Sequence, residues 1–237
     1  FVAAESAWRM QTRNDPQVNM LRNTVAVFAA AIGGADLISV LPHTAALGLP
    51  DGAARRVARN TQVVLSEEAN LYRVIDPAAG AGAVEDLTAK LIDKAWALFQ
   101  QIEAAGGIIA DLQAGRLLAS VAEVRNARLK AVSSRKDPLT GASEFPDVAE
   151  KLPDVLAPLP PGTETGKGFA LMRLAEPFEA LRDAADKVAT KEGQRPAVFM
   201  ANLGGVADFT ARTIFAKNFF EAGGLRALSN DGFASRD

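Results

Sequence analysis

Residues 195–205 read RPAVFMANLGG, and this stretch decides the class of the fold. Residues 197–203 form a mostly apolar run without polar alternation, which is typical of a buried strand in a parallel sheet. The glycine pair after it predicts a tight turn into a helix over residues 207–222, and residues 225–228 begin a second strand. The sequence therefore predicts a βαβ unit and an α/β fold.

A similar unit stands at the other end of the chain. Residues 1–8 predict a short strand, and residues 35–41 predict a second one. Between them, Asp15 and Pro16 predict the N-cap and first position of a helix whose apolar residues recur about every 3.6 residues. We expect this helix to end at Gly33. The order strand, helix, strand is typical of a parallel α/β protein.

The region between the two units is predicted to be helical. Asp51 predicts the N-cap of an arginine-rich helix, and apolar residues from Leu87 to Ile102 form the stripe of a longer one. Further helices are expected over residues 108–112, 118–132 and 176–190.

A proline-rich segment interrupts the helical region. Residues 133–168 contain six of the twelve prolines in the chain and predict an extended arm. These patterns divide the chain into residues 1–50, a helical region over residues 51–194 that includes the arm, and residues 195–237.

The composition limits the classes of function. With 26 Lys and Arg against 28 Asp and Glu, the formal net charge is −2, so the chain lacks the excess positive charge that nucleic acids or anionic membranes attract. Its longest apolar run, residues 25–34, is too short to cross a membrane. There is no cysteine and only one histidine. We expect a cytoplasmic protein with no metal site and no nucleic-acid or membrane partner.

The most specific motif lies in the arginine-rich helix and after it. Residues 58–62 read ARNTQ, the acidic pair Glu67-Glu68 follows, and residues 76–80 read DPAAG. This series resembles the methylmalonyl-CoA mutase family of adenosylcobalamin-dependent acyl-CoA mutases. Three other segments are similar to the same family: residues 14–34, 94–107 and 195–224.

The resemblance implies an architecture for each part of the chain. Residues 1–50 correspond to the C-terminal end of a (β/α)8 barrel, and residues 51–194 to a mostly helical linker with the arm at residues 133–168. Residues 195–237 correspond to the beginning of a flavodoxin-like cobalamin-binding domain.

Within the family, the chain most resembles the small, non-catalytic subunit of the heterodimeric enzymes. Cobalamin domains of the family bind the corrin with an Asp-x-His-x-x-Gly loop, whose histidine ligates cobalt. Val206, Asp208 and Ala211 stand at the Asp, His and Gly positions here. A carboxylate replaces a neutral imidazole poorly, because nitrogen donors suit this metal. The resemblance therefore implies a degenerate loop and no cobalamin on this chain.

The barrel segment also departs from the catalytic pattern. Catalytic members carry a His and a Gln in the strand before a Ser-Gly-Trp turn, and Val2 and Ala4 stand in their places. Neither side chain can donate a hydrogen bond to a thioester carbonyl. We therefore expect no catalytic residue here, and we expect a large partner subunit to bind adenosylcobalamin and the acyl-CoA substrate.

Two groups of residues have both a functional and a structural interpretation. His43 follows a predicted barrel strand, on the face where barrel active sites lie, but without a second His or Cys a structural or exposed histidine is favoured. The guanidinium groups on the arginine-rich helix can bind an acidic partner or a nucleotide phosphate through Arg55, Arg56 and Arg59. Ion pairs with nearby acids on the helix surface are the commoner arrangement.

Three further motifs have simple interpretations. Glu67 and Glu68 are adjacent and point to different helix faces, which favours ion pairs over paired catalytic carboxylates. Gly204 and Gly205 favour a tight strand-to-helix turn, because the full Gly-x-Gly-x-x-Gly pattern is missing. Residues 162–168, GTETGKG, differ from a Walker A loop in their spacing, so nucleotide binding is not expected there.

Together these observations predict part of a small mutase subunit. It would support a large subunit that interconverts methylmalonyl-CoA and succinyl-CoA by a radical mechanism. The alternative is a fragment of a catalytic single-chain acyl-CoA mutase, which would have to bind cobalamin without the histidine loop. The apolar stripe over residues 87–102 and the arm around residues 137–141 are the candidate interfaces with the large subunit.

Overall fold

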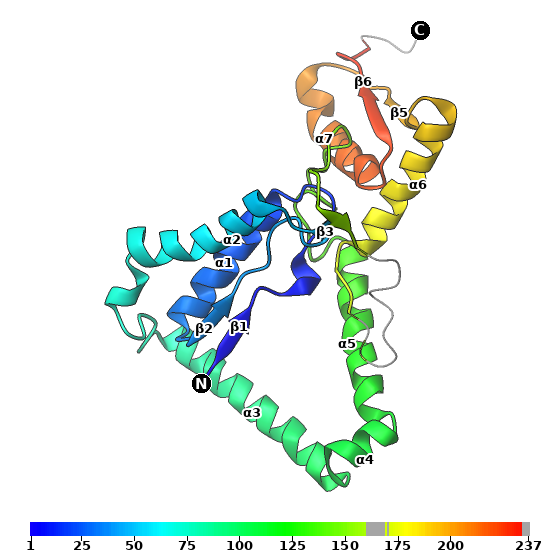
Figure 1. Ribbon diagram of the computed structural model, residues 1–237. Coiled ribbons are helices and arrows are strands. Elements are labelled where there is room, and N and C mark those ends of the chain that lie inside the picture. The colour runs from blue at the N-terminus through cyan, green and yellow to red at the C-terminus, as the bar shows by residue number, and fades with distance from the viewer. Residues whose placement is uncertain (160–168, 170, 234–237) are drawn as a thin grey trace.

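The computed structural model describes residues 1–159, 169 and 171–233 (Figure 1). Helices predominate, and the described residues form three separate two-stranded sheets. One α/β unit lies at each end of the chain, and an open V of helices joins them (Figure 1). The mixture of helices and sheet confirms the α/β class.

The N-terminal unit contains β1 (Ala3–Glu5), α1 (Val18–Ile32) and β2 (Leu37–Ser39). The two strands pair in parallel, with Ala4 opposite Ile38. This confirms the predicted order of strand, helix and strand. Because two strands do not close a barrel, the (β/α)8 assignment of residues 1–50 stays a prediction.

The start of α1 differs from the prediction. Asp15 has a φ of +47°, and Gln17 occupies the N-cap position without a side-chain hydrogen bond. The backbone N–H of Asp15 donates to a carboxylate oxygen of Glu150 at 2.6 Å. The expectation that Asp15 caps the helix was wrong. Glu150, which is distant in the sequence, instead holds Asp15 in a turn before the first residue of α1.

The predicted arginine-rich helix is α2 (Gly52–Val63). The Asp51 carboxylate accepts the N–H of Ala54 at 2.8 Å, which confirms Asp51 as its N-cap. A π-helical turn, η2 (Val64–Glu68), extends the helix, and a short 3-10 helix, η3 (Leu71–Arg73), follows.

The V consists of α3 (Gly82–Ala104), α4 (Gly107–Gln113) and α5 (Arg116–Ser133) (Figure 1). Gly106 and Gly115 have positive φ and are the N-cap residues of α4 and α5. No residue of α3, all of which the structure describes, is buried. Its apolar stripe therefore remains uncovered.

The proline-rich arm packs against the rest of the chain where the structure describes it. Ala142 and Ser143 are buried, although residues 133–168 predict an extended arm. Farther along, β4 (Ala157–Pro158) pairs antiparallel with β3 (Gly48–Leu49). A Cβ atom at Gly48 would lie 2.1 Å from the Ala157 carbonyl oxygen, so this approach requires glycine.

The C-terminal unit follows α6 (Glu176–Glu192) and contains β5 (Ala197–Met200), α7 (Val206–Ala222) and β6 (Arg226–Ser229). The strands pair in parallel, which confirms the predicted βαβ order. The expectation of a buried strand was wrong, because only Met200 of the four β5 residues is buried and Phe199 is 57% exposed. The described residues do not enclose both faces of this small sheet.

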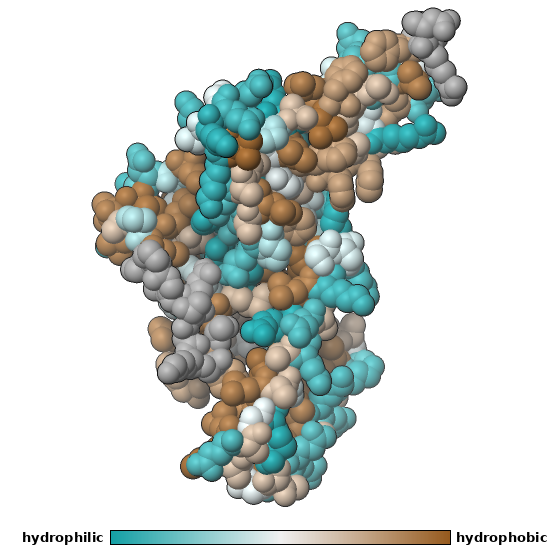
Figure 2. Space-filling model, turned by 90° about the vertical axis from the view of Figure 1, so that its right-hand side faces the viewer, coloured by the Kyte–Doolittle hydropathy of each residue, from teal (hydrophilic) through white to brown (hydrophobic). Residues whose placement is uncertain are grey.

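Apolar burial is limited and consists mainly of small side chains. Val27 and Ala54 lie where α1 contacts α2, and Val132, Ala175 and Ala185 are buried near the junction of the arm, α5 and α6. Figure 2 shows hydrophobic residues at the surface, among polar ones, on the face that carries α5 and α6. Much apolar surface is therefore exposed and available for contacts with other polypeptide segments.

Candidate functional site

The segment that corresponds to the cobalamin-binding loop is helical. Val206, Asp208 and Ala211 lie in the first turns of α7, which confirms the helix predicted over residues 207–222. Gly204 has a φ of +85°, and the helix begins directly after Gly205. This confirms the glycine pair as a tight turn between strand and helix.

Asp208 makes local hydrogen bonds at this turn. Its Oδ2 accepts the N–H of Gly205 at 2.9 Å, and its own N–H donates to the Gly205 carbonyl oxygen at 2.9 Å. A Cβ atom at Gly204 would lie 2.8 Å from Asp208 Oδ2, which explains the need for glycine. The carboxylate is thus a helix cap.

A buried asparagine closes the carboxyl ends of β5 and β6. Asn202 is 5% exposed, and its Nδ2 donates to Ser229 Oγ and to the Asn230 carbonyl oxygen, both at 2.9 Å. Its Oδ1 accepts the hydroxyl of Thr213 at 2.6 Å. The sequence analysis missed this residue, although an asparagine in an otherwise apolar run was the available signal.

A second polar network lies beyond the carboxyl ends of β1 and β2, where barrel enzymes place their active sites. Asn19 Oδ1 accepts the N–H of Thr12 at 3.0 Å and Arg22 Nη1 at 2.8 Å. Gln11 Nε2 donates to Asn23 Oδ1 at 2.8 Å. Burial lowers the pKa of the Arg22 guanidinium, which the charge of Asp15 partly offsets.

The sequence analysis missed these residues as well. Asn19, Arg22 and Asn23 recur at helical spacing on one face of α1, a pattern that signals a buried polar face. Their hydrogen bonds join the helix to the loops that leave the two strands. These bonds hold the side-chain amides of Asn19 and Asn23 and the guanidinium of Arg22 in fixed positions at this end of the unit.

His43 lies in the loop after β2. Its carbonyl oxygen accepts Asn19 Nδ2 at 2.9 Å, while its Nδ1 is buried without a hydrogen-bond partner among the described residues. Burial lowers the pKa of the imidazole, and the charge of Asp51 acts in the opposite direction. The described residues contain no group of three or more His, Cys, Asp or Glu that could hold a metal ion.

The arginines of α2 do not form the expected ion pairs. Arg55 Nε donates to the Pro50 carbonyl oxygen, and Arg59 donates to Asn60 Oδ1. Within the described part of the chain, no carboxylate lies within 4.0 Å of Arg55, Arg56 or Arg59. The ion-pair interpretation was therefore wrong for these arginines.

The acidic pair that follows α2 also lacks the expected ion pairs in the described part of the chain. Glu67 and Glu68 lie in η2, and neither has a basic partner within 4.0 Å among the described residues. The ion-pair interpretation was therefore wrong for this pair too. The Walker-like segment, residues 162–168, lies outside the described residues.

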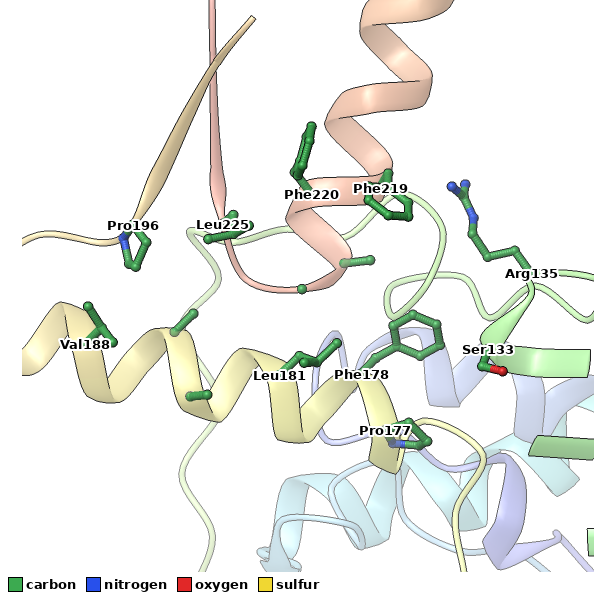
Figure 3. Close-up of a pocket in the computed structure, with 14 residues that line it drawn as sticks. Ser133, Arg135, Pro177, Phe178, Leu181, Val188, Pro196, Phe219, Phe220 and Leu225 are labelled. Atoms are coloured by element: carbon green, nitrogen blue, oxygen red, sulfur yellow. The ribbon is translucent and has the colours of Figure 1, made fainter. Parts of the chain in front are cut away.

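An apolar cavity of about 640 Å³ separates α6 from α7 (Figure 3). Phe178 and Leu181 on α6 face Phe219 on α7 and Leu225 before β6 across it. Arg135 stands at its edge, where Nε donates to Glu144 Oε1 at 2.6 Å. The lining contains no unpaired polar cluster that would bind a charged ligand.

Comparison with known sequences places these features in a family. A family model described as methylmalonyl-CoA mutase matches residues 1–171. The chain belongs to the methylmalonyl-CoA mutase family. The match includes the ARNTQ and DPAAG motifs, and it confirms the resemblance that they indicate.

Individual relatives extend the similarity past the family match. The chain is 47% identical over 222 residues to a methylmalonyl-CoA mutase small subunit of Streptomyces virginiae, which covers 92% of this chain and 35% of that protein. It is 40% identical over 230 residues to the small subunit of Propionibacterium freudenreichii subsp. shermanii, covering 97% of this chain and 35% of that protein. The chain thus spans about a third of the length of these relatives.

A relative named without a subunit matches a shorter part of the chain. The methylmalonyl-CoA mutase of Escherichia coli K12 is 34% identical over 151 residues, which cover 64% of this chain and 21% of that protein. Within the described residues, no helix has the length and apolar character needed to cross a membrane.

The residues of the C-terminal unit do not fit the cobalamin cofactor on which the family depends. The resemblance to the family's cobalamin domains puts Asp208 at the position of the cobalt-ligating histidine, and the Asp208 carboxylate is hydrogen-bonded to the backbone of Gly205. The neighbouring positions hold the apolar Val206 and Ala211. None of the three offers a nitrogen donor.

Proposed function

We propose that this chain is part of the small subunit of a methylmalonyl-CoA mutase. The small subunit would support a large subunit that isomerises methylmalonyl-CoA and succinyl-CoA. In this proposal the large subunit binds adenosylcobalamin and acyl-CoA, and the present chain contributes neither a catalytic residue nor a cofactor ligand.

The observation that carries the proposal is the local role of Asp208. Its carboxylate caps α7 by accepting the N–H of Gly205 at 2.9 Å, in place of an imidazole free to ligate cobalt. Val2, which precedes β1, and Ala4, which lies in it, both have apolar side chains. A subunit that keeps the family's local elements but not these donors is suited to assembly and not to catalysis.

The comparisons favour this proposal over a single-chain mutase. Similarity to the named small subunits covers 92% or more of the chain, and it includes the C-terminal unit. Similarity to the protein from Escherichia coli covers 64% of the chain. Loss of the cobalamin motif within a retained βαβ unit also agrees with a supporting role.

The apolar stripe of α3 is the proposed main contact with other polypeptide. Leu91, Trp96 and Phe99 are each more than half exposed, and the Trp96 and Phe99 rings stack with centroids 5.3 Å apart. Exposed aromatic residues on a long helix are typical of interface cores. The arm around residues 137–141 is the second proposed contact. Within the chain, the Thr140 carbonyl oxygen of this arm accepts a hydrogen bond from Arg22 Nη2.

The proposal is tested with the full-length small subunit that contains this chain and with the large subunit of the same organism. The two are purified separately and together, and hydroxocobalamin is added to each sample. We expect a stable complex, and a shifted visible spectrum for the large subunit and the complex but not for the small subunit alone.

Two results would overturn the proposal. Stoichiometric, tight binding of hydroxocobalamin by the separate small subunit would contradict the supporting role. Failure of the two full-length subunits to co-purify would contradict the partnership. The Asp208→His variant, which restores only the imidazole, serves as a control, and we expect it to bind no cobalamin because Val206 and Ala211 still stand at the other two positions of the motif.

A further inference from the structure

The proposed function does not use the basic face of α2. Gly52, Arg55, Arg56 and Arg59 surround a shallow, open depression, and all three guanidinium groups are exposed. At 100° per residue, these four residues and Val63 fall within one arc of about 100° on the helix. They therefore form one continuous surface, which we call the α2 basic face.

The α2 basic face brings together, on one side of a helix, three arginines that have no carboxylate partner in the described chain. Within the described residues, six arginines have a carboxylate within 4.0 Å: Arg13, Arg116, Arg135, Arg173, Arg182 and Arg195. None of the three on α2 has one, although Asp51 stands at the start of the same helix. The Asp51 side chain instead accepts the N–H of Ala54.

This concentration of charge is unfavourable in the isolated chain. Arg55 and Arg59 are four residues apart, and Arg56 and Arg59 are three apart, so their like charges repel on one helix face. An external anion would relieve this repulsion, which makes the face a binding surface for negative charge.

The shape of the face selects the kind of anion. The depression is shallow and open, and an exposed apolar side chain, Val63, continues it along the helix. Small phosphorylated ligands prefer concave sites, whereas arginines beside apolar residues on an open surface are typical of protein interfaces. Planar guanidinium groups bind carboxylates in bidentate pairs.

We infer that the α2 basic face docks a carboxylate-rich surface of the large mutase subunit. This inference rests on the proposed function and adds to it a second, electrostatic contact besides the apolar stripe of α3. The contact would steer the approach of the two subunits, so its removal would slow their association more than it changes dissociation.

The test measures association of the full-length subunits by stopped-flow at about 20 mM and about 500 mM salt. The variant Arg56→Glu/Arg59→Glu reverses two charges of the face. The matched control, Arg125→Glu/Arg128→Glu, reverses two exposed arginines at the same spacing on α5, which also lack a carboxylate within 4.0 Å. We expect the first variant to associate about tenfold more slowly at low salt and the control to match the wild type.

The difference should shrink at high salt, because screening removes long-range attraction. If the reversal prevents folding, the neutral pair Arg56→Gln/Arg59→Gln supplies the same test with an expected fall of about threefold. Equal rates for the wild type and the α2 variants, or an equal fall in the α5 control, would overturn the inference while leaving the proposed function intact. Absence of any association of the wild-type subunits would overturn both.

Discussion

The carboxylate of Asp208 accepts the backbone N–H of Gly205 at 2.9 Å and so closes the first turn of α7. In the family resemblance, Asp208 stands at the position of the cobalt-ligating histidine. At this position the side chain therefore stabilises the start of a helix. The substitution has a structural role and is more than the loss of a ligand.

Replacement of Asp208 should therefore affect folding. We expect Asp208→Ala to lower the free energy of unfolding by about 1 kcal/mol, because the Gly205 N–H loses its acceptor and the helix loses a favourable charge at its N-terminus. Asp208→Asn keeps an acceptor and should lose about half as much. Urea unfolding followed by circular dichroism measures both, and an unchanged Asp208→Ala variant would contradict the capping role.

A buried carboxylate on α6 connects this helix to the segment that follows β1. Glu179 on α6 is 2% exposed, and its Oε1 accepts the N–H of Arg13 and Nη1 of Arg173, both at 2.7 Å. Glu179→Ala should destabilise the protein by about 3 kcal/mol, because the buried guanidinium of Arg173 loses the carboxylate 2.7 Å from it.

Asp183 provides the matched control for Glu179. It binds the same arginine, Arg13, but its side chain is 46% exposed. Asp183→Ala should cost less than about 1 kcal/mol, because water screens this pair. Chemical unfolding of both variants measures the two losses of unfolding free energy. Similar losses for Glu179→Ala and Asp183→Ala would show that burial does not decide how much Glu179 contributes to stability.

Glu150 holds the arm against the N-terminal unit and α6. Its carboxylate accepts the N–H of Asp15 at 2.6 Å, Asn14 Nδ2 at 2.9 Å and Arg182 Nη2 at 2.8 Å. We expect Glu150→Ala to release the arm and to speed limited proteolysis within residues 140–159 by about tenfold, which corresponds to about 1.4 kcal/mol of lost local stability. The exposed Asp154→Ala variant is the control and should be cleaved at the wild-type rate.

The single imidazole should make stability depend on pH. Burial lowers the pKa of His43 in the folded chain below its ordinary value of 6.5. The unfolded chain then binds a proton more readily as the pH falls, so the stabilisation present above pH 6.5 is lost as the pH falls through the folded pKa.

The variant His43→Gln isolates this effect. Between pH 7.5 and pH 5.5, the wild type should lose more unfolding free energy than His43→Gln loses. Nuclear magnetic resonance of the single imidazole measures its pKa directly. A midpoint at or above 6.5, or identical pH dependence of the two proteins, would contradict the burial argument.

The stripe of α3 can be followed by the fluorescence of Trp96, which is 58% exposed. In a Trp8→Phe background, Trp96 is the only indole of the described chain. Addition of the large subunit should shift its emission to shorter wavelength, because docking removes the ring from water. A Trp96→Glu variant should weaken the complex by at least about tenfold, and an unshifted emission in a formed complex would place the interface elsewhere.

Local elements were predictable from the sequence because their signals are local. The Asp51 cap and the apolar spacing in α1 and α3 each act within a few residues of the element that they define. The family was also recognisable, because ARNTQ and DPAAG are specific short motifs.

The chain's long-range contacts were decided only by the tertiary structure. Asp15 has the sequence of a cap, yet Glu150, 135 residues away, holds it in a left-handed turn. The pairing of β3 with β4, the burial of Asn202 and the unpaired charges of α2 likewise depend on which distant segments meet. Periodicity and capping describe how a residue interacts along its own helix or strand, whereas burial and charge pairing depend on the surfaces that the completed fold brings together.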